Sequence, residues 1–159
     1  MGRWALPTGL FLLAAAEAGE LDLPGEYGVD DIPVIVQDKR FSGDRLDENR
    51  SFLNDSGLMA DTVVVNGTLA PYLDVTTERV RLRVLNGSTA RTYNFGFDDD
   101  RGFDLIGTDG GLLATPHRTD RIMLSPGERA EIVVDVEPGE QTVLRSYPPD
   151  LGVDHPGGR

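Results

Sequence analysis

Metal-binding or acid–base chemistry would have to come from very few side chains in this sequence. Its 159 residues include two histidines, His117 and His155, and no cysteine. Without a thiol the chain can form neither a disulfide nor a cysteine-ligated metal site, and it has no cysteine nucleophile. His117 follows Pro116 in a predicted loop, and His155 lies in the C-terminal tail. A metal site needs several converging ligands, so we interpret both as solvent-exposed histidines rather than as ligands or general bases.

Aspartates near the middle of the chain could supply oxygen ligands to calcium. Asp98, Asp99 and Asp100 are consecutive, and Asp104 follows them closely. This spacing is not that of an EF-hand, so we interpret the run as the solvated tip of a turn. The chain also lacks a phosphate-binding Gly-Lys-Ser/Thr motif and a G-x-S-x-G nucleophile motif. From the sequence we therefore assign no catalytic, cofactor-binding or metal-binding residue.

Two other groups of polar residues allow a functional and a structural interpretation. Arg81 and Arg83 could bind an anionic partner, but on the polar face of a strand they are expected to pair with carboxylates across the sheet. Four asparagines match the glycosylation pattern N-x-S/T, which matters only in a eukaryotic secretory pathway. Two of them precede glycine, which favours turns. The four are Asn49, Asn54, Asn66 and Asn86.

The charge balance of the chain is acidic and argues against some partners. It contains 27 Asp and Glu against 15 Lys and Arg, a formal net charge of -12. Such a chain repels a phosphate backbone and an anionic membrane surface, so we expect neither nucleic acid nor membrane as a partner. Its length suits a single domain with its own hydrophobic core.

The segments that would position these side chains have the pattern of β-strands. Short β-branched or alternating apolar runs recur about every 8–12 residues, with Gly, Pro or Asn between them, as in all-β sandwiches. Residues 42–58 lack such a pattern and are predicted to form a loop. The aromatic stripe of Tyr93, Phe95, Phe97 and Phe103 is expected in the core, with some of it free to face a neighbouring domain. The predicted strands cover residues 32–36, 62–65, 80–84, 93–97, 103–106, 121–124, 130–136 and 142–145.

Five stretches taken together resemble one known family. They are GVDDIPVIVQDKRF (28–41), DTVVVNG (61–67), RLRVLNGSTARTYNFGF (81–97), FDLIGTDGGLL (103–113) and LSPGERAEIVVDV (124–136). The combination resembles multicopper oxidases, and specifically the second of the three cupredoxin, or plastocyanin-like, domains in the bacterial laccase, cuprous oxidase and bilirubin oxidase group. The resemblance implies a cupredoxin-like Greek-key β-sandwich.

The resemblance also implies a division of the chain. Residues 25–148 would be the cupredoxin-like domain, and residues 149–159 a linker or tail. Residues 1–24 would hold the last strand of a preceding domain, near 8–13, and a linker. The apolar run of residues 10–16 before Ala16-Glu17-Ala18 alternatively resembles a weak signal peptide, and it is too short for a transmembrane helix.

The copper chemistry of the family needs ligands that this chain does not contain. A blue mononuclear site uses a cysteine thiolate and two histidines, and the trinuclear cluster of these oxidases takes its histidines in pairs such as His-x-His. In the resembled group these ligands belong to the first and third domains. The resemblance therefore implies a copper-free, non-catalytic middle domain of a parent enzyme that would couple oxidation of phenols or metal ions to reduction of dioxygen.

Several expectations follow from this interpretation. The partners would be flanking cupredoxin domains or separate chains that supply them, and exposed inter-domain faces would favour self-association. The alternative is a stand-alone, copper-free binding or scaffold module of the same fold. The sequence leaves the location open, although parents of this family are typically periplasmic or extracellular.

Overall fold

The computed structural model describes residues 22–47 and 57–148. The predicted signal-like or preceding-strand segment and the C-terminal tail lie almost entirely outside the described residues, as do Asn49, Asn54 and His155. Among the described residues, no helix is long and apolar enough to cross a membrane.

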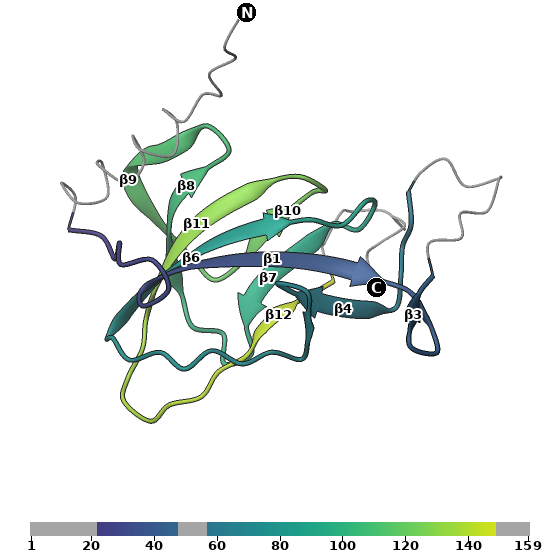
Figure 1. Ribbon diagram of the computed structural model, residues 1–159. Helices are drawn as coiled ribbons and strands as arrows, with labels where there is room; N and C mark the ends of the chain where they lie inside the picture. The colour runs from purple at the N-terminus through teal and green to yellow at the C-terminus, as the bar shows by residue number, and fades with distance from the viewer. Residues whose placement is uncertain (1–21, 48–56, 149–159) are drawn as a thin grey trace, which may run out of the picture.

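All regular structure in the described residues is β, as the alternating pattern predicts (Figure 1). The strands are β1 (Asp31–Lys39), β2 (Phe41–Ser42), β3 (Arg45–Leu46), β4 (Thr62–Val65), β5 (Thr68–Leu69), β6 (Arg79–Asn86), β7 (Tyr93–Phe97), β8 (Phe103–Thr108), β9 (Gly111–Thr119), β10 (Ile122–Leu124), β11 (Arg129–Asp135) and β12 (Leu144–Ser146).

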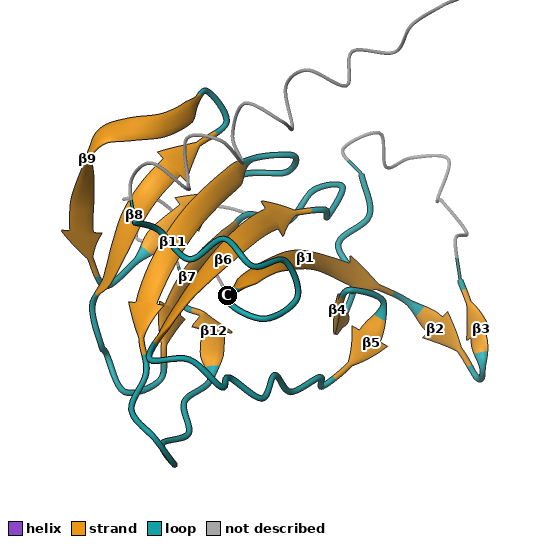
Figure 2. Ribbon diagram, turned by 60° about the vertical axis from the view of Figure 1, so that its left-hand side comes forward, coloured by secondary structure: helices purple, strands orange, loops and turns teal. Residues whose placement is uncertain are grey.

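These strands form two packed sheets and a small hairpin (Figure 2). The larger sheet has the order β5-β4-β1-β6-β11-β8-β9, and the smaller one has the order β10-β7-β12. The chain passes between the sheets repeatedly, from β6 to β7 and from β7 to β8 for example. Strands β1 and β6 are parallel, whereas the other pairs are antiparallel. The parallel pair requires a long connection, and β4 and β5 lie within it.

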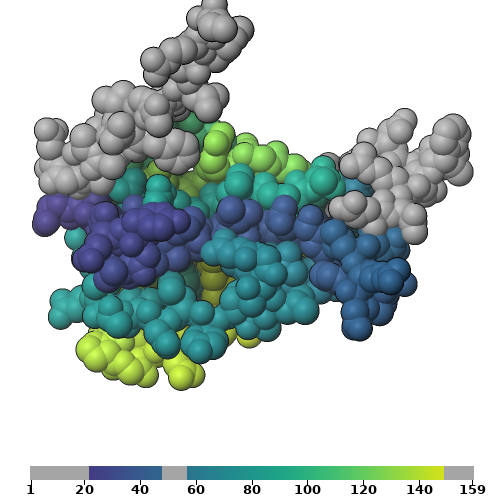
Figure 3. Space-filling view, viewed as in Figure 1, coloured from purple at the N-terminus to yellow at the C-terminus, as the bar shows by residue number. Residues whose placement is uncertain are grey.

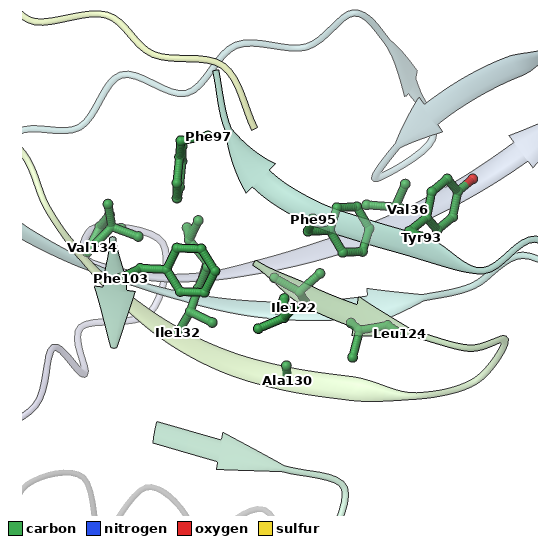
Figure 4. Close-up of a cluster of buried hydrophobic side chains, with 13 residues drawn as sticks. Val36, Tyr93, Phe95, Phe97, Phe103, Ile122, Leu124, Ala130, Ile132 and Val134 are labelled. Carbon is green, nitrogen blue, oxygen red and sulfur yellow. The ribbon is translucent and has the colours of Figure 1, made fainter. Parts of the chain in front are cut away.

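The core lies between the two sheets and is rich in aromatic and β-branched side chains (Figure 4). The rings of Tyr93 and Phe95 stack with centroids 5.2 Å apart, and Phe97 meets Phe103 edge to face at 5.9 Å. All four of these aromatic residues are buried, so none of the predicted stripe faces outward. The core cluster consists of Val36, Val80, Leu82, Val84, Tyr93, Phe95, Phe97, Phe103, Ile122, Leu124, Ala130, Ile132 and Val134.

The turn chemistry read from the sequence is confirmed where β4 turns into β5. Asn66 and Gly67 occupy the turn with φ values of 49° and 78°. Positive φ at both central residues is the feature that selects Asn-Gly in tight hairpins. The turn fixes the register of the hairpin, in which Val65 lies opposite Thr68.

Three local expectations are wrong. The segment predicted as a loop from residue 42 overlaps the β2–β3 hairpin, which turns at Gly43 with φ at 61°. Each strand of this hairpin has only two residues, which is too short to show a periodic pattern in the sequence. Strand β9 was missed because it is an exposed edge strand without apolar alternation. The unbroken apolar run of residues 32–36 is typical of a strand covered on both faces, but Ile35 is 40% exposed.

We predict that Phe103→Ala destabilises the domain strongly, because this ring is fully buried between the sheets. Truncating such a side chain costs about 3–5 kcal/mol of unfolding free energy. Urea unfolding followed by fluorescence measures the change. The control Tyr72→Ala alters an 88% exposed side chain, and its effect is expected to stay within about 0.5 kcal/mol. Equal losses in the two variants would contradict the described core.

Candidate functional site

The one histidine among the described residues lies on a sheet edge rather than in a loop. His117 belongs to β9, opposite Leu105 of β8, and it is exposed. The loop assignment was wrong because Pro116 suggested a chain break, whereas proline is tolerated on an edge strand. In the part of the chain that the structure describes, no group of three or more His, Cys, Asp or Glu side chains could hold a metal ion. His117 therefore has no converging ligands there.

The aspartates that could have bound calcium are bound by protein donors instead. Asp98 accepts hydrogen bonds from the Val143 N–H at 2.9 Å and the Thr142 hydroxyl at 3.1 Å. The other three carboxylates each pair with an arginine. These pairs are Asp99 with Arg101, Asp100 with Arg121 and Asp104 with Arg118. Asp98, Asp99 and Asp100 are exposed, as expected for the tip of a turn, and ion pairs brace this turn against neighbouring elements.

Arg101 is the centre of one of these surface clusters. Its guanidinium donates to Asp99 and to Glu140, and lies 6.0 Å from the centroid of the Phe97 ring. The hydrogen bonds from Arg101 hold the pKa of Asp99 at about 2, below its ordinary 3.8. The same contacts lower the pKa of Glu140 and raise that of Arg101. The cluster ties the turn after β7 to the connection before β12.

An open groove of about 600 Å³ lies beside this cluster. Three arginines line it, and each of them pairs with a carboxylate of the chain. Arg79 pairs with Asp135, and Arg118 with Asp104, while Arg101 is held as described. Each cation of the groove therefore has a neighbouring carboxylate as its partner.

A second polar cluster is buried at the end of β1. The Asp38 side chain is 0% exposed and accepts hydrogen bonds from the Ala60 N–H at 2.8 Å and from Arg91 Nε at 3.0 Å. Burial by itself raises the pKa of Asp38. The hydrogen bonds from Ala60, Ser88 and Arg91 outweigh burial, so the pKa lies below its ordinary value. The Asp38 N–H in turn donates to the Ser88 hydroxyl.

Asn86 and Tyr93 extend this cluster across the end of β6. The Asn86 amide donates to the carbonyls of Arg91 and Leu124, and its oxygen accepts from the Ser88 N–H. The Ser88 and Tyr93 hydroxyls are 3.0 Å apart, and burial raises the pKa of the Tyr93 phenol. Asn86 is 0% exposed, so its Asn-Gly sequence marks a buried hub rather than a simple surface turn.

The sequence contains a signal for both of these buried polar residues. Asp38 is two residues beyond the core residue Val36, and Asn86 is two residues beyond Val84. Because side chains alternate along a strand, both polar residues must lie on the core face. Extending the period-two pattern past its last apolar member would have identified them.

The arginines on β6 pair across the sheet as expected. Arg81 forms a salt bridge with Glu131 on β11, and Arg83 forms one with Asp31 on β1. Arg81 is only 2% exposed, so its guanidinium is not accessible to an anion in solution. Asn66 is also engaged, since its side-chain amide bonds to the Pro33 carbonyl and the Ile35 N–H.

We predict that Arg91→Met destabilises the domain by about 3 kcal/mol or more, because it leaves the buried Asp38 carboxylate without its cation. Urea unfolding measures the loss. The matched control Arg129→Met breaks a pair with Asp109 whose side chains are 65% and 46% exposed, and it should cost no more than about 1 kcal/mol. A loss at Arg91 as small as that at Arg129 would contradict the described network.

We predict that Asp99 titrates with a pKa of about 2 in the folded chain, and that Arg101→Gln raises this pKa toward 3.8. Because the folded pKa is the lower one, ionised Asp99 stabilises the fold above pH 4, and this contribution is lost as the pH falls toward 2. Carboxyl carbon shifts followed by NMR measure both values. An unchanged pKa in the variant would rule out Arg101 as the cause.

The matched protein-family model, described as multicopper oxidase, covers residues 37–146. Two curated relatives are called cell division protein FtsP. The one from Rahnella sp. is 40% identical over 137 residues, which is 86% of this chain and 29% of that protein. The one from Aggregatibacter aphrophilus is 43% identical, over 86% of this chain and 28% of that protein. The chain thus spans under a third of the length of these relatives.

Solved multicopper oxidases share the fold. The McoA multicopper oxidase of Aquifex aeolicus matches with a TM-score of 0.77 and 38% identity, over 86% of this chain and 31% of that structure. A laccase from Pediococcus acidilactici matches with a TM-score of 0.75 and 39% identity, over 80% of this chain and 28% of that structure. These likenesses confirm the all-β, cupredoxin-like Greek-key sandwich expected from the sequence. The chain belongs to the multicopper oxidase family.

Proposed function

We propose that the chain is a copper-free middle domain of a larger, multicopper-oxidase-like protein, in which it holds two flanking domains at a fixed spacing. One observation supports this most directly. A region amounting to 86% of this chain corresponds to only 31% of a solved multicopper oxidase, and this chain has no cysteine with which to build a blue copper site.

The donor set of the chain does not fit the copper centres of the family. A mononuclear site needs a thiolate that the sequence lacks, and a histidine-rich cluster needs convergent imidazoles. Among the described residues His117 stands alone on an exposed edge strand. We therefore derive no oxidative step for this chain, and its contribution is mechanical.

The packing of the domain suits a spacer. Two sheets share one continuous core, and partly buried ion pairs join β1 to β6 and β6 to β11. Protein cores of this kind are close-packed and resist deformation. A rigid body of this kind keeps the groups on either side of it at a constant separation. The proposal carries with it the periplasmic or extracellular location expected for the family.

A second candidate function is a non-enzymatic scaffold, and the names of the relatives favour it. Curated relatives at 38–43% identity are called cell division protein FtsP. The same middle domain could thus belong to a protein that acts in cell division. The reading frames on either side of this one in the genome distinguish an oxidase parent from a scaffold parent. His-x-His before this chain and His-Cys-His after it indicate an oxidase, and their absence indicates the scaffold.

We predict that the isolated chain retains no copper and oxidises no phenol. The chain is loaded with Cu(I) or Cu(II) and desalted. Retained copper is then measured by elemental analysis, together with absorbance in the blue thiolate band and oxygen uptake with a phenol. A His117→Ala variant serves as the control for adventitious binding. Stoichiometric copper with turnover, abolished in that variant, would overturn the proposed function.

A further inference from the structure

One exposed stretch of the chain has a composition unsuited to permanent contact with water. Residues 66–74, with the sequence NGTLAPYLD, are all exposed. Within this stretch Leu69, Tyr72 and Leu73 are 58%, 88% and 48% exposed. The stretch has one charged residue, Asp74, in a chain whose residues are 26% charged. Five consecutive exposed apolar residues, from Leu69 to Leu73, mark a covered or functional surface rather than an ordinary loop.

The backbone turns this segment out of the sheet. Strand β5 has only two residues and forms the edge of the larger sheet. Ala70 follows it with φ at 43°, and Pro71 comes next. A residue with a Cβ in this conformation costs about 1 kcal/mol or more, and proline lacks the N–H that another strand would need. The edge strand therefore ends at Leu69, and a partner at residues 70–73 would contact mainly side chains.

Further uncovered apolar side chains lie near the β4–β5 turn, where this segment begins. Phe41 and Leu46 face each other across the β2–β3 hairpin and are 41% and 46% exposed. The hairpin stands out beside the β4–β5 end of the sheet in both ribbon views (Figures 1 and 2). In Figure 3 this blue hairpin projects next to the teal surface that includes the chain after β4. Val63, on β4 itself, is 47% exposed.

We propose that residues 69–73 form a docking surface for the adjoining part of the same multicopper-oxidase-like protein, that is, for protein outside residues 1–159. This rests on the proposed function. The chain spans under a third of its curated relatives, so the parent has enough further protein to cover the surface. The near absence of charge fits the apolar centre of a permanent interface. The net charge of -12 disfavours a second copy of this acidic chain as the occupant.

Site-specific photo-crosslinking in the native host tests this proposal. The substitution Tyr72→p-benzoylphenylalanine is introduced at the chromosomal locus, so that the protein is studied with whatever normally accompanies it. After irradiation, the crosslinked peptide is identified by mass spectrometry. We expect it to come from a cupredoxin-like region outside residues 1–159. Met123, which is 51% exposed on β10 of the other sheet, is the matched control and is expected to give no such product.

Other outcomes would overturn the proposal. A crosslink to residues 1–159 of the same or a second chain, to an unrelated protein, or to nothing would each exclude the proposed occupant. The double variant Leu69→Ser, Leu73→Ser is expected to cause loss of the Tyr72 product while leaving the thermal midpoint of the isolated chain unchanged, since both side chains are exposed. A lower thermal midpoint of the double variant would indicate that these leucines have a structural role instead.

The docking surface and the proposed function fail in different ways. Copper retained with turnover by the isolated chain would refute the copper-free role, whatever the crosslink shows. A Tyr72 crosslink to an unrelated protein would refute the docking surface and leave the copper result intact.

Discussion

The buried carboxylate of Asp38 is the constraint on which much of this domain depends. It lies at the end of β1 with its side chain removed from solvent, where an ionised group needs a nearby cation and hydrogen bonds to be stable. The carboxylate accepts hydrogen bonds from the Ala60 N–H, before β4, and from Arg91, between β6 and β7, while the Asp38 N–H donates to the Ser88 hydroxyl. The ion pair thereby fixes the entry to the β4–β5 hairpin and the crossing from the larger sheet to the smaller one.

This network adds specificity to a core that is otherwise apolar. Hydrophobic packing alone tolerates many arrangements of similar volume. Asn86 contributes directional bonds to two carbonyls and one N–H, and so holds the β6–β7 crossing in one geometry. Hydrophobic burial thus provides the bulk of the stability, while a few buried polar groups determine how the sheets are joined.

The fold was largely predictable because the strands that build the core alternate clearly. Val80, Leu82 and Val84 show the period of two, and the Asn-Gly pair after β4 has the turn geometry that its residues favour. Strand β9 left no such signal, since an exposed edge strand need not alternate. The Asn-Gly sequence of Asn86 favours a turn, and the apolar run before Asp38 ends at Val36, so neither pattern alone indicates a buried polar side chain.

Whether a polar side chain can bind a ligand depends on how many hydrogen-bond and ion-pair partners it already has within the chain. A run of aspartates resembles a cation site until its arginines are placed, and two of these, Arg118 and Arg121, are distant in the sequence. Asp100 and Arg121, for example, belong to separate elements that only the fold brings together. The absence of cysteine, by contrast, was decisive from the sequence alone, because no arrangement of the chain can replace a missing thiolate.

The left-handed backbone of Ala70 has a consequence for how this protein can change during evolution. A sheet edge that continued would bind a partner through backbone groups, which every sequence possesses. An edge that ends after two residues leaves recognition to the shapes of Leu69, Tyr72 and Leu73. If these side chains meet a neighbour, a change in size on one side requires a compensating change on the other. The two contacting surfaces would then coevolve. Domains exchanged between distant relatives would therefore fit poorly, even though their folds are the same.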